Sequence, residues 1–100
     1  MELEDLVQPE GVIAHLKVTS KKQALQELSE RAAKLTGLSE RAIFETLVER
    51  ERLGSTGVGQ GIAIPHGKLP EIDRLYGLFA RLSTPIDFES VDDQPVDLIF

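Results

Sequence analysis

The stretch Gly54-Ser-Thr-Gly-Val-Gly-Gln-Gly-Ile-Ala-Ile-Pro-His-Gly-Lys68 is the part of the sequence around which the rest of the chain is organised. Ahead of its apolar triplet Ile62-Ala63-Ile64 this stretch contains four of the chain's eight glycines, and His66 then follows between a proline and a glycine. Glycine is used where the backbone turns with positive φ or approaches another group closely. A histidine between proline and glycine lies at a turn, where a side chain is easily presented to a partner. We therefore interpret His66 as the reactive group and its neighbours as its support.

Composition limits the classes of function that remain. One hundred residues, 41% apolar and 28% charged, fit one globular domain. A net charge of -6 argues against nucleic acid and anionic membranes, because both need a clustered basic face. The absence of cysteine excludes a disulfide framework, thiol catalysis and a cysteine-ligated metal. The N-terminus is unlike a signal peptide and no apolar run could span a bilayer, so we expect a cytoplasmic domain without membrane insertion.

Two helices are predicted ahead of the glycine-rich stretch. Ser20 begins a capping-box pattern, and an apolar stripe with a 3.6-residue period follows it over 21–36. Ser39 is placed to cap a second helix over about 40–53. That helix ends in Glu49-Arg-Glu-Arg52, which is either an ordinary solvated helix end or a means of directing one arginine toward the glycine loop. Position in the sequence does not choose between these two interpretations.

Short apolar segments bounded by turn residues predict several strands. The segments are residues 12–18, 61–64, 76–82 and 96–100, with a helical turn within 1–8 and loops or turns over 69–74, 83–88 and 92–95. One strand, two helices and three further strands indicate an α/β or α+β layered fold. The sequence ends on the apolar run Leu98-Ile-Phe100, so we expect a strand that is cut off and a sheet that is incomplete.

The glycine pattern itself does not predict a nucleotide site. It lacks the Gly-Lys-Ser/Thr ending of a P-loop, and it follows a helix and precedes a strand. That order is the reverse of the one that directs a helix N-terminus at phosphate. A loop that needs several left-handed residues explains the glycines equally well.

The chemistry open to His66 is that of a histidine acting alone. The only other histidine is His15, which we interpret as an exposed or edge-strand residue, and a metal site would need two or three further ligands. We therefore expect no metal and no cofactor. Neutral imidazole is a competent nucleophile near neutral pH, because its pKa is about 6.5. One such role is to accept a phosphoryl group from a phosphorylated partner and to pass it on.

A phosphoryl acceptor needs an accessible ring nitrogen, a carbonyl that fixes the other nitrogen, and donors for the phosphoryl oxygens. We expect the backbone N–H groups of Ser55, Thr56 and Gly67 to supply donors. Lys68 or the arginines at the helix end over 50–52 would supply positive charge. Hydrogen bonds from such groups to phosphoryl oxygens are charge-assisted and strong.

The run from Arg50 to Lys68 resembles the phosphorylation-site region of the mannitol/fructose-type enzyme IIA domains of the bacterial phosphotransferase system. It is most similar to the nitrogen-related branch, enzyme IIA-Ntr. Residues 82–88 and 92–98 also match the pattern of that branch. The resemblance implies that His66 is the phosphorylated histidine and that Arg50 assists the phosphoryl group. It also implies a mixed sheet flanked by helices on both faces.

The resemblance further implies partners and an output. The donor would be a small HPr-like phosphocarrier protein, charged by an enzyme I from phosphoenolpyruvate. The targets would be regulatory, such as potassium-transport or sensor-kinase proteins. The alternatives are a fructose- or mannitol-specific enzyme IIA that passes phosphate to a permease IIB domain, and a structural fragment without activity.

Domains of this family continue beyond the point where the present sequence stops. They carry a further strand, helices and a second histidine near the active site, and no residue here matches that histidine, since His15 is not in its place. We therefore expect residues 1–100 to be the N-terminal portion of a single type-2 enzyme IIA domain.

Overall fold

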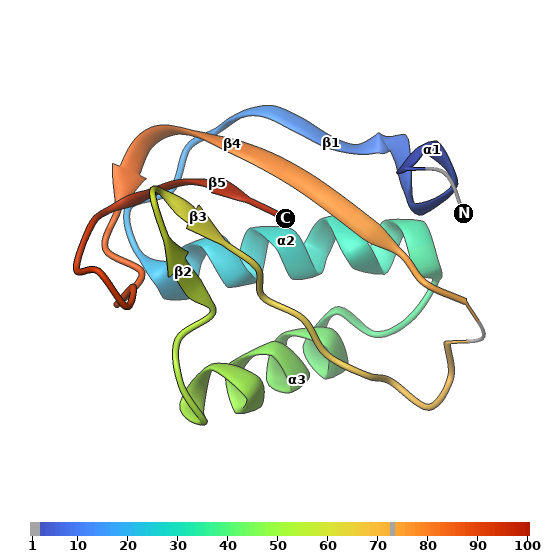
Figure 1. Cartoon of the computed structure of the whole chain (residues 1–100). Coiled ribbons are helices and arrows are strands. Elements are labelled where there is room, and N and C mark those ends of the chain that lie inside the picture. The colour runs from blue at the N-terminus through green and yellow to red at the C-terminus, as the bar shows by residue number, and fades with distance from the viewer. Residues whose placement is uncertain (1–2, 73) are drawn as a thin grey trace.

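The computed structural model describes residues 3–72 and 74–100, and the side chains of residues 3 and 4 are not described. Residues 1 and 2 of the expected helical turn and residue 73 of the expected loop therefore lie outside the described residues. The elements are α1 (Leu3–Leu6), β1 (Val7–Leu16), α2 (Lys21–Thr36), α3 (Glu40–Arg52), β2 (Gly57–Gly59), β3 (Ile62–Ala63), β4 (Gly77–Ile86) and β5 (Val96–Ile99) (Figure 1).

The five strands form one mixed sheet, in the order β1-β4-β5-β3-β2. β1 runs parallel to β4, and β3 runs parallel to β5, whereas the pairs β4–β5 and β2–β3 are antiparallel. The predicted α/β class is confirmed. The short strand β3 lies inside the sheet, so the chain that leaves it toward His66 starts from a fixed position.

Both long helices begin at the serines that the sequence indicated. The Ser20 hydroxyl accepts a hydrogen bond from the Gln23 backbone N–H at 3.1 Å, and the Ser39 hydroxyl accepts one from Ala42 at 3.2 Å. α2 ends at Gly37, whose φ of 78° is left-handed and whose N–H bonds to the carbonyl of Ala33. These caps satisfy backbone groups that a helix leaves unpaired, which is why the helix limits were predictable.

Three strands differ from expectation. β1 begins at Val7 rather than at residue 12 and passes through Pro9 with a shift in register, which an edge strand tolerates. β4 continues to Ile86, beyond the expected end at residue 82, and its register against β5 also shifts along this extension. β2 lies within the glycine stretch, where we expected only loop, and pairs with β3.

The main core lies between the sheet and α2. Its buried apolar members are Ile13, Leu16, Val18, Ala24, Leu25, Leu28, Ala63, Ala80, Leu82, Ile86, Phe88, Val96 and Ile99. α3 packs against this cluster through partly buried side chains, Phe44, Leu47 and Val48.

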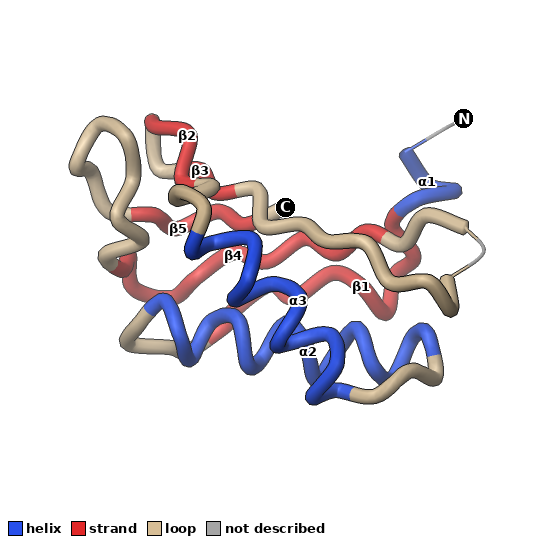
Figure 2. Tube along the Cα trace, turned by 90° about the horizontal axis from the view of Figure 1, so that it is seen from below, coloured by secondary structure: helices blue, strands red, loops and turns tan. Residues whose placement is uncertain are grey.

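The family resemblance implied helices on both faces of the sheet, but both long helices lie on one face. Figures 1 and 2 show α2 and α3 on the same side of the sheet. On the opposite face, Val12 is 48% exposed, while its neighbour Ile13 is buried toward α2. In the described residues, therefore, one sheet face is covered by long helices and the other is open.

Candidate functional site

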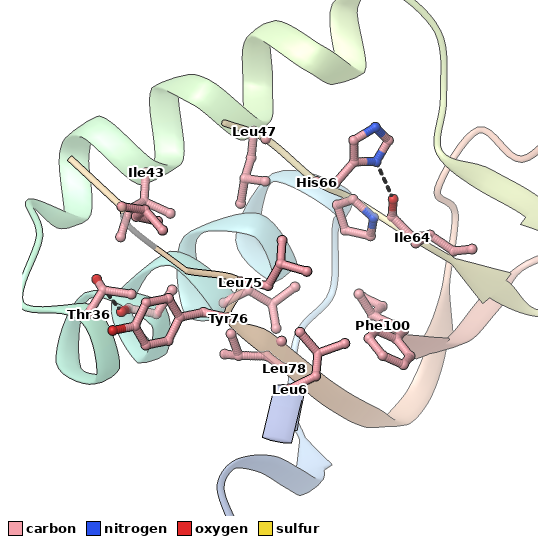
Figure 3. Close-up of a pocket in the computed structure, with 17 residues that line it drawn as sticks. Leu6, Thr36, Ile43, Leu47, Ile64, His66, Leu75, Tyr76, Leu78 and Phe100 are labelled. Atoms are coloured by element: carbon pink, nitrogen blue, oxygen red, sulfur yellow. Dashed lines mark hydrogen bonds between the residues drawn. The ribbon is translucent and has the colours of Figure 1, made fainter. Parts of the chain in front are cut away.

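His66 lies on an exposed segment just after β3. Its Nδ1 lies 2.9 Å from the backbone carbonyl oxygen of Ile64, two residues earlier. Figure 3 shows this contact and shows the imidazole directed away from the apolar side chains beneath the segment. The ring is therefore held by its own backbone and presented outward, as the position between proline and glycine predicted.

Arg50 reaches His66 from the last turn of α3. Its Nε donates to His66 Nε2 at 3.3 Å, and its Nη1 donates to the Gly54 carbonyl at 2.9 Å. Arg52, two residues further along the helix, instead pairs with the exposed Glu49, and their atoms Nη1 and Oε1 are 3.4 Å apart. Arg50, and not Arg52, is therefore the arginine that contacts the histidine. The sequence alone had not decided whether either arginine did so.

The hydrogen-bond partners assign the tautomer of His66. The guanidinium of Arg50 can only donate, so Nε2 must be the nitrogen that accepts. Nδ1 then carries the proton and donates it to the Ile64 carbonyl. The nucleophilic lone pair is therefore on Nε2, which faces Arg50.

The other expected donors fall into two groups. The Thr56 N–H is engaged, because it donates to Glu51 Oε1 at 3.0 Å. At Ser55 the hydroxyl donates to the Phe88 carbonyl at 2.7 Å, and the expected role of the Ser55 N–H stays a prediction. Thr56 is only 4% exposed, so its N–H braces the loop and is not free for a phosphoryl oxygen. The residues 67 and 68 are exposed beside His66, and their expected role stays a prediction.

Sequence reasoning missed Glu51 and Lys21. The Glu51 carboxylate accepts from both the N–H and the hydroxyl of Thr56, and Lys21 Nζ lies 3.0 Å from its Oε1. Lys21 is the first residue of α2 and lies 30 positions before Glu51, so no local spacing pattern joins them. The only signal was a glutamate beside the arginine of the helix end.

The chain was also compared with known proteins. Residues 5–100 match the model of the family described as "Phosphoenolpyruvate-dependent sugar phosphotransferase system, EIIA 2". The chain belongs to this EIIA 2 family. Its relatives include the nitrogen regulatory proteins of Bradyrhizobium diazoefficiens, 64% identical over 100 residues, and of Escherichia coli K12, 46% identical over 101 residues.

Solved structures share the fold of this EIIA 2 chain. The crystal structure of nitrogen regulatory protein IIA-Ntr from Neisseria meningitidis matches with a TM-score of 0.94 and 37% identity, over 98% of this chain and 67% of that one. IIA mannitol from Escherichia coli matches with a TM-score of 0.72 and 26% identity, over 90% and 65% of the two chains. All of this chain aligns with 65% of the Bradyrhizobium protein and 62% of the Escherichia coli one, so it spans somewhat less than two-thirds of these curated relatives.

An apolar cavity of about 300 Å³ lies beneath the His66 segment of this EIIA 2 domain. Side chains of α2, α3 and the segment after His66 line it, among them Thr36, Ile43, Leu47, Leu75 and Tyr76 (Figure 3). Ile64, Pro65, His66 and Gly67 line it as well, so the segment that carries the imidazole forms part of the cavity wall.

The described residues were also searched for a metal-binding arrangement. There, no group of three or more His, Cys, Asp or Glu side chains is arranged to hold a metal ion. Over the same ranges, none of the helices has the length and apolar character needed to cross a bilayer.

Proposed function

We propose that the chain is a phosphoryl carrier of the nitrogen-related phosphotransferase system, which accepts a phosphoryl group on Nε2 of His66. The observation that carries the proposal is the arrangement of the exposed imidazole: Nδ1 is held by the Ile64 carbonyl, and Nε2 faces Arg50. A nucleophile with a fixed tautomer and an adjacent cation is what phosphoryl transfer requires of an acceptor. Membership of the EIIA 2 family supports the same reaction class.

The transfer step follows from these positions. The Nε2 lone pair attacks phosphorus on a phosphohistidine of the HPr-like donor, and the donor's N–P bond breaks with its electron pair returning to the donor imidazole. The proton on Nδ1 stays in place, because its hydrogen bond to Ile64 stabilises the tautomer in which Nε2 is free. No cofactor enters the step.

Arg50 has a different partner before and after transfer. In the present structure its Nε–H donates to the lone pair that attacks. Once that pair forms the P–N bond, the guanidinium turns to the phosphoryl oxygens, where an arginine fork binds best. The further donors that we propose for these oxygens are the N–H of the exposed Gly67, the N–H of Ser55 and the ammonium of Lys68.

We propose a regulatory output in the cytoplasm rather than sugar uptake. Phosphorylation adds about 1.5 to 2 negative charges and three acceptor oxygens, so it changes which protein surfaces bind at His66. The proposed targets are regulatory proteins, such as potassium-transport or sensor-kinase proteins, whose binding would depend on this change. The support is the 64% identity with a nitrogen regulatory protein, against 35% with the 2-O-alpha-mannosyl-D-glycerate-specific EIIABC component of Escherichia coli.

The proposal is tested by reconstituting the transfer. We expect an acid-labile, base-stable adduct on the chain when phosphoenolpyruvate, enzyme I and the phosphocarrier are all present, since phosphohistidine has that stability. Omitting enzyme I should remove the adduct. Absence of any adduct in the complete mixture would refute the proposed carrier role. A pull-down that retains a permease IIB domain in preference to regulatory proteins would favour the sugar-uptake alternative.

A further inference from the structure

We propose that Glu51 is a positioning residue that holds the His66 imidazole from both sides. The proposal rests on the proposed function of His66 as a phosphoryl acceptor. Glu51 touches neither His66 nor any atom that would react, so its effect is exerted through Thr56, through Ile64 and through the backbone of Arg50.

The burial of Glu51 is unusual for its place in the chain. Its side chain is 5% exposed, whereas that of Glu49 in the same helical turn is 74% exposed. A carboxylate this deeply buried needs partners that replace water. Lys21 Nζ at 3.0 Å and the two donors of Thr56 supply them.

The first connection runs to Nδ1. With its N–H and hydroxyl on Glu51, Thr56 presents its carbonyl to the N–H of Ile64 at 3.0 Å. The Ile64 carbonyl then accepts the Nδ1 proton of His66 at 2.9 Å. These contacts fix Thr56 and then Ile64 in position, so the anchor at Glu51 holds in place the carbonyl that accepts the Nδ1 proton.

The second connection runs to Nε2. Glu51 follows Arg50 directly, and its own carbonyl accepts from the N–H of Gly54 at 3.1 Å. The buried carboxylate therefore fixes the last turn of α3 at the point where the arginine side chain departs. From there the arginine donates to Gly54 and to Nε2.

Lys21 makes the burial of Glu51 possible. Its side chain is 17% exposed, and its Nζ lies 4.9 Å from the centroid of the Phe88 ring and 3.6 Å from Glu89 Oε1. Lys21 stands at the start of α2, so it links the site to the helix that carries the core. Its removal should weaken the positioning in the same direction as a change at Glu51, with a smaller effect because Thr56 still binds the carboxylate.

The test compares Glu51→Gln with Glu49→Gln, which removes the same charge from the same helical turn. We expect Glu51→Gln to lower the fraction of the Nδ1–H tautomer of His66, measured by nitrogen-15 NMR on the unphosphorylated chain. We also expect it to slow phosphoryl transfer by about 10- to 100-fold, since a misplacement of about 1 Å can cost about 10²-fold. Glu49→Gln should match the wild type in both measurements.

Two outcomes overturn the proposal. One is a Glu51→Gln variant that loses thermal stability but keeps both the tautomer fraction and the transfer rate of the wild type. That result would show that Glu51 has a structural role only. If Glu51→Gln does not fold, Lys21→Met and Thr56→Val are measured in its place by the same two methods. The second refuting outcome is a wild-type tautomer fraction and a wild-type transfer rate in both of these variants. The tautomer is measured without phosphorylation, so a shifted tautomer in a chain that accepts no phosphoryl group would refute the carrier role alone.

Discussion

The variant His66→Ala is expected to lose phosphoryl acceptance completely while keeping its fold. The imidazole is the nucleophile that we propose, so its removal takes away the nitrogen that would form the P–N bond. The side chain is exposed and its two hydrogen bonds, to Ile64 and Arg50, are at the surface. Its loss should change the free energy of unfolding by no more than about 0.5 kcal/mol, as for most surface substitutions. Adduct formation and urea denaturation measure the two quantities.

His15→Ala is the matched control for this variant. His15 is exposed on β1, at the edge of the sheet, and no role is expected for it. Its replacement should leave labelling at the wild-type level. Labelling that survives in His66→Ala, or that disappears in His15→Ala, would show that the acceptor has been assigned to the wrong residue.

The variant Arg50→Ala should slow transfer strongly without preventing it. Removing one preorganised donor from a site of developing charge costs about 10²- to 10³-fold in rate. The lost bond to the Gly54 carbonyl is exposed, so the fold should lose only about 1 kcal/mol. Single-turnover transfer from the phosphorylated carrier measures the rate, and thermal unfolding measures the stability.

Arg52→Ala and Arg50→Lys serve as comparisons. Arg52 lies on the same helix end but pairs only with exposed Glu49, so its loss should leave the transfer rate unchanged. Lysine at position 50 keeps the charge but cannot bind the Gly54 carbonyl and a phosphoryl oxygen with a planar fork, so it should restore the rate in part. An unfolded Arg50→Ala protein would instead indicate that the arginine is mainly structural.

The sequence predicted best those features that depend on near neighbours. Ser20 and Ser39 mark the starts of α2 and α3 because a capping serine bonds to an N–H three residues away. The turn that presents His66 was predictable for the same reason, since Pro65 and Gly67 are adjacent to it. A carbonyl on Nδ1 was a chemical requirement, and the structure supplies it from Ile64.

Features that depend on distant pairing were not predictable. β2 pairs locally with β3, but its Gly57 also packs against Ser90, far along the sequence, where an added Cβ would lie 2.2 Å from the serine hydroxyl oxygen. The longer β1 and β4 pass through Pro9 and Pro85, which read locally as breaks, because pairing in the sheet outweighs local preference.

The candidate site divides in the same way. A family resemblance was needed to select Arg50 from the arginines of the helix end. The ion pair of Glu51 with Lys21 joins the ends of two helices, and nothing in either local sequence indicates it. The same is true of Thr56, which was expected to bind a phosphoryl group and instead binds Glu51.

The central claim concerns one atom, Nε2 of His66. Phosphorylating the nitrogen-15-labelled chain and recording the phosphorus–nitrogen coupling of the adduct by NMR tests it most directly. We expect the coupling at Nε2, with the proton retained on Nδ1 and bonded to Ile64. Coupling at Nδ1 of His66, or at any nitrogen of His15, would contradict the account.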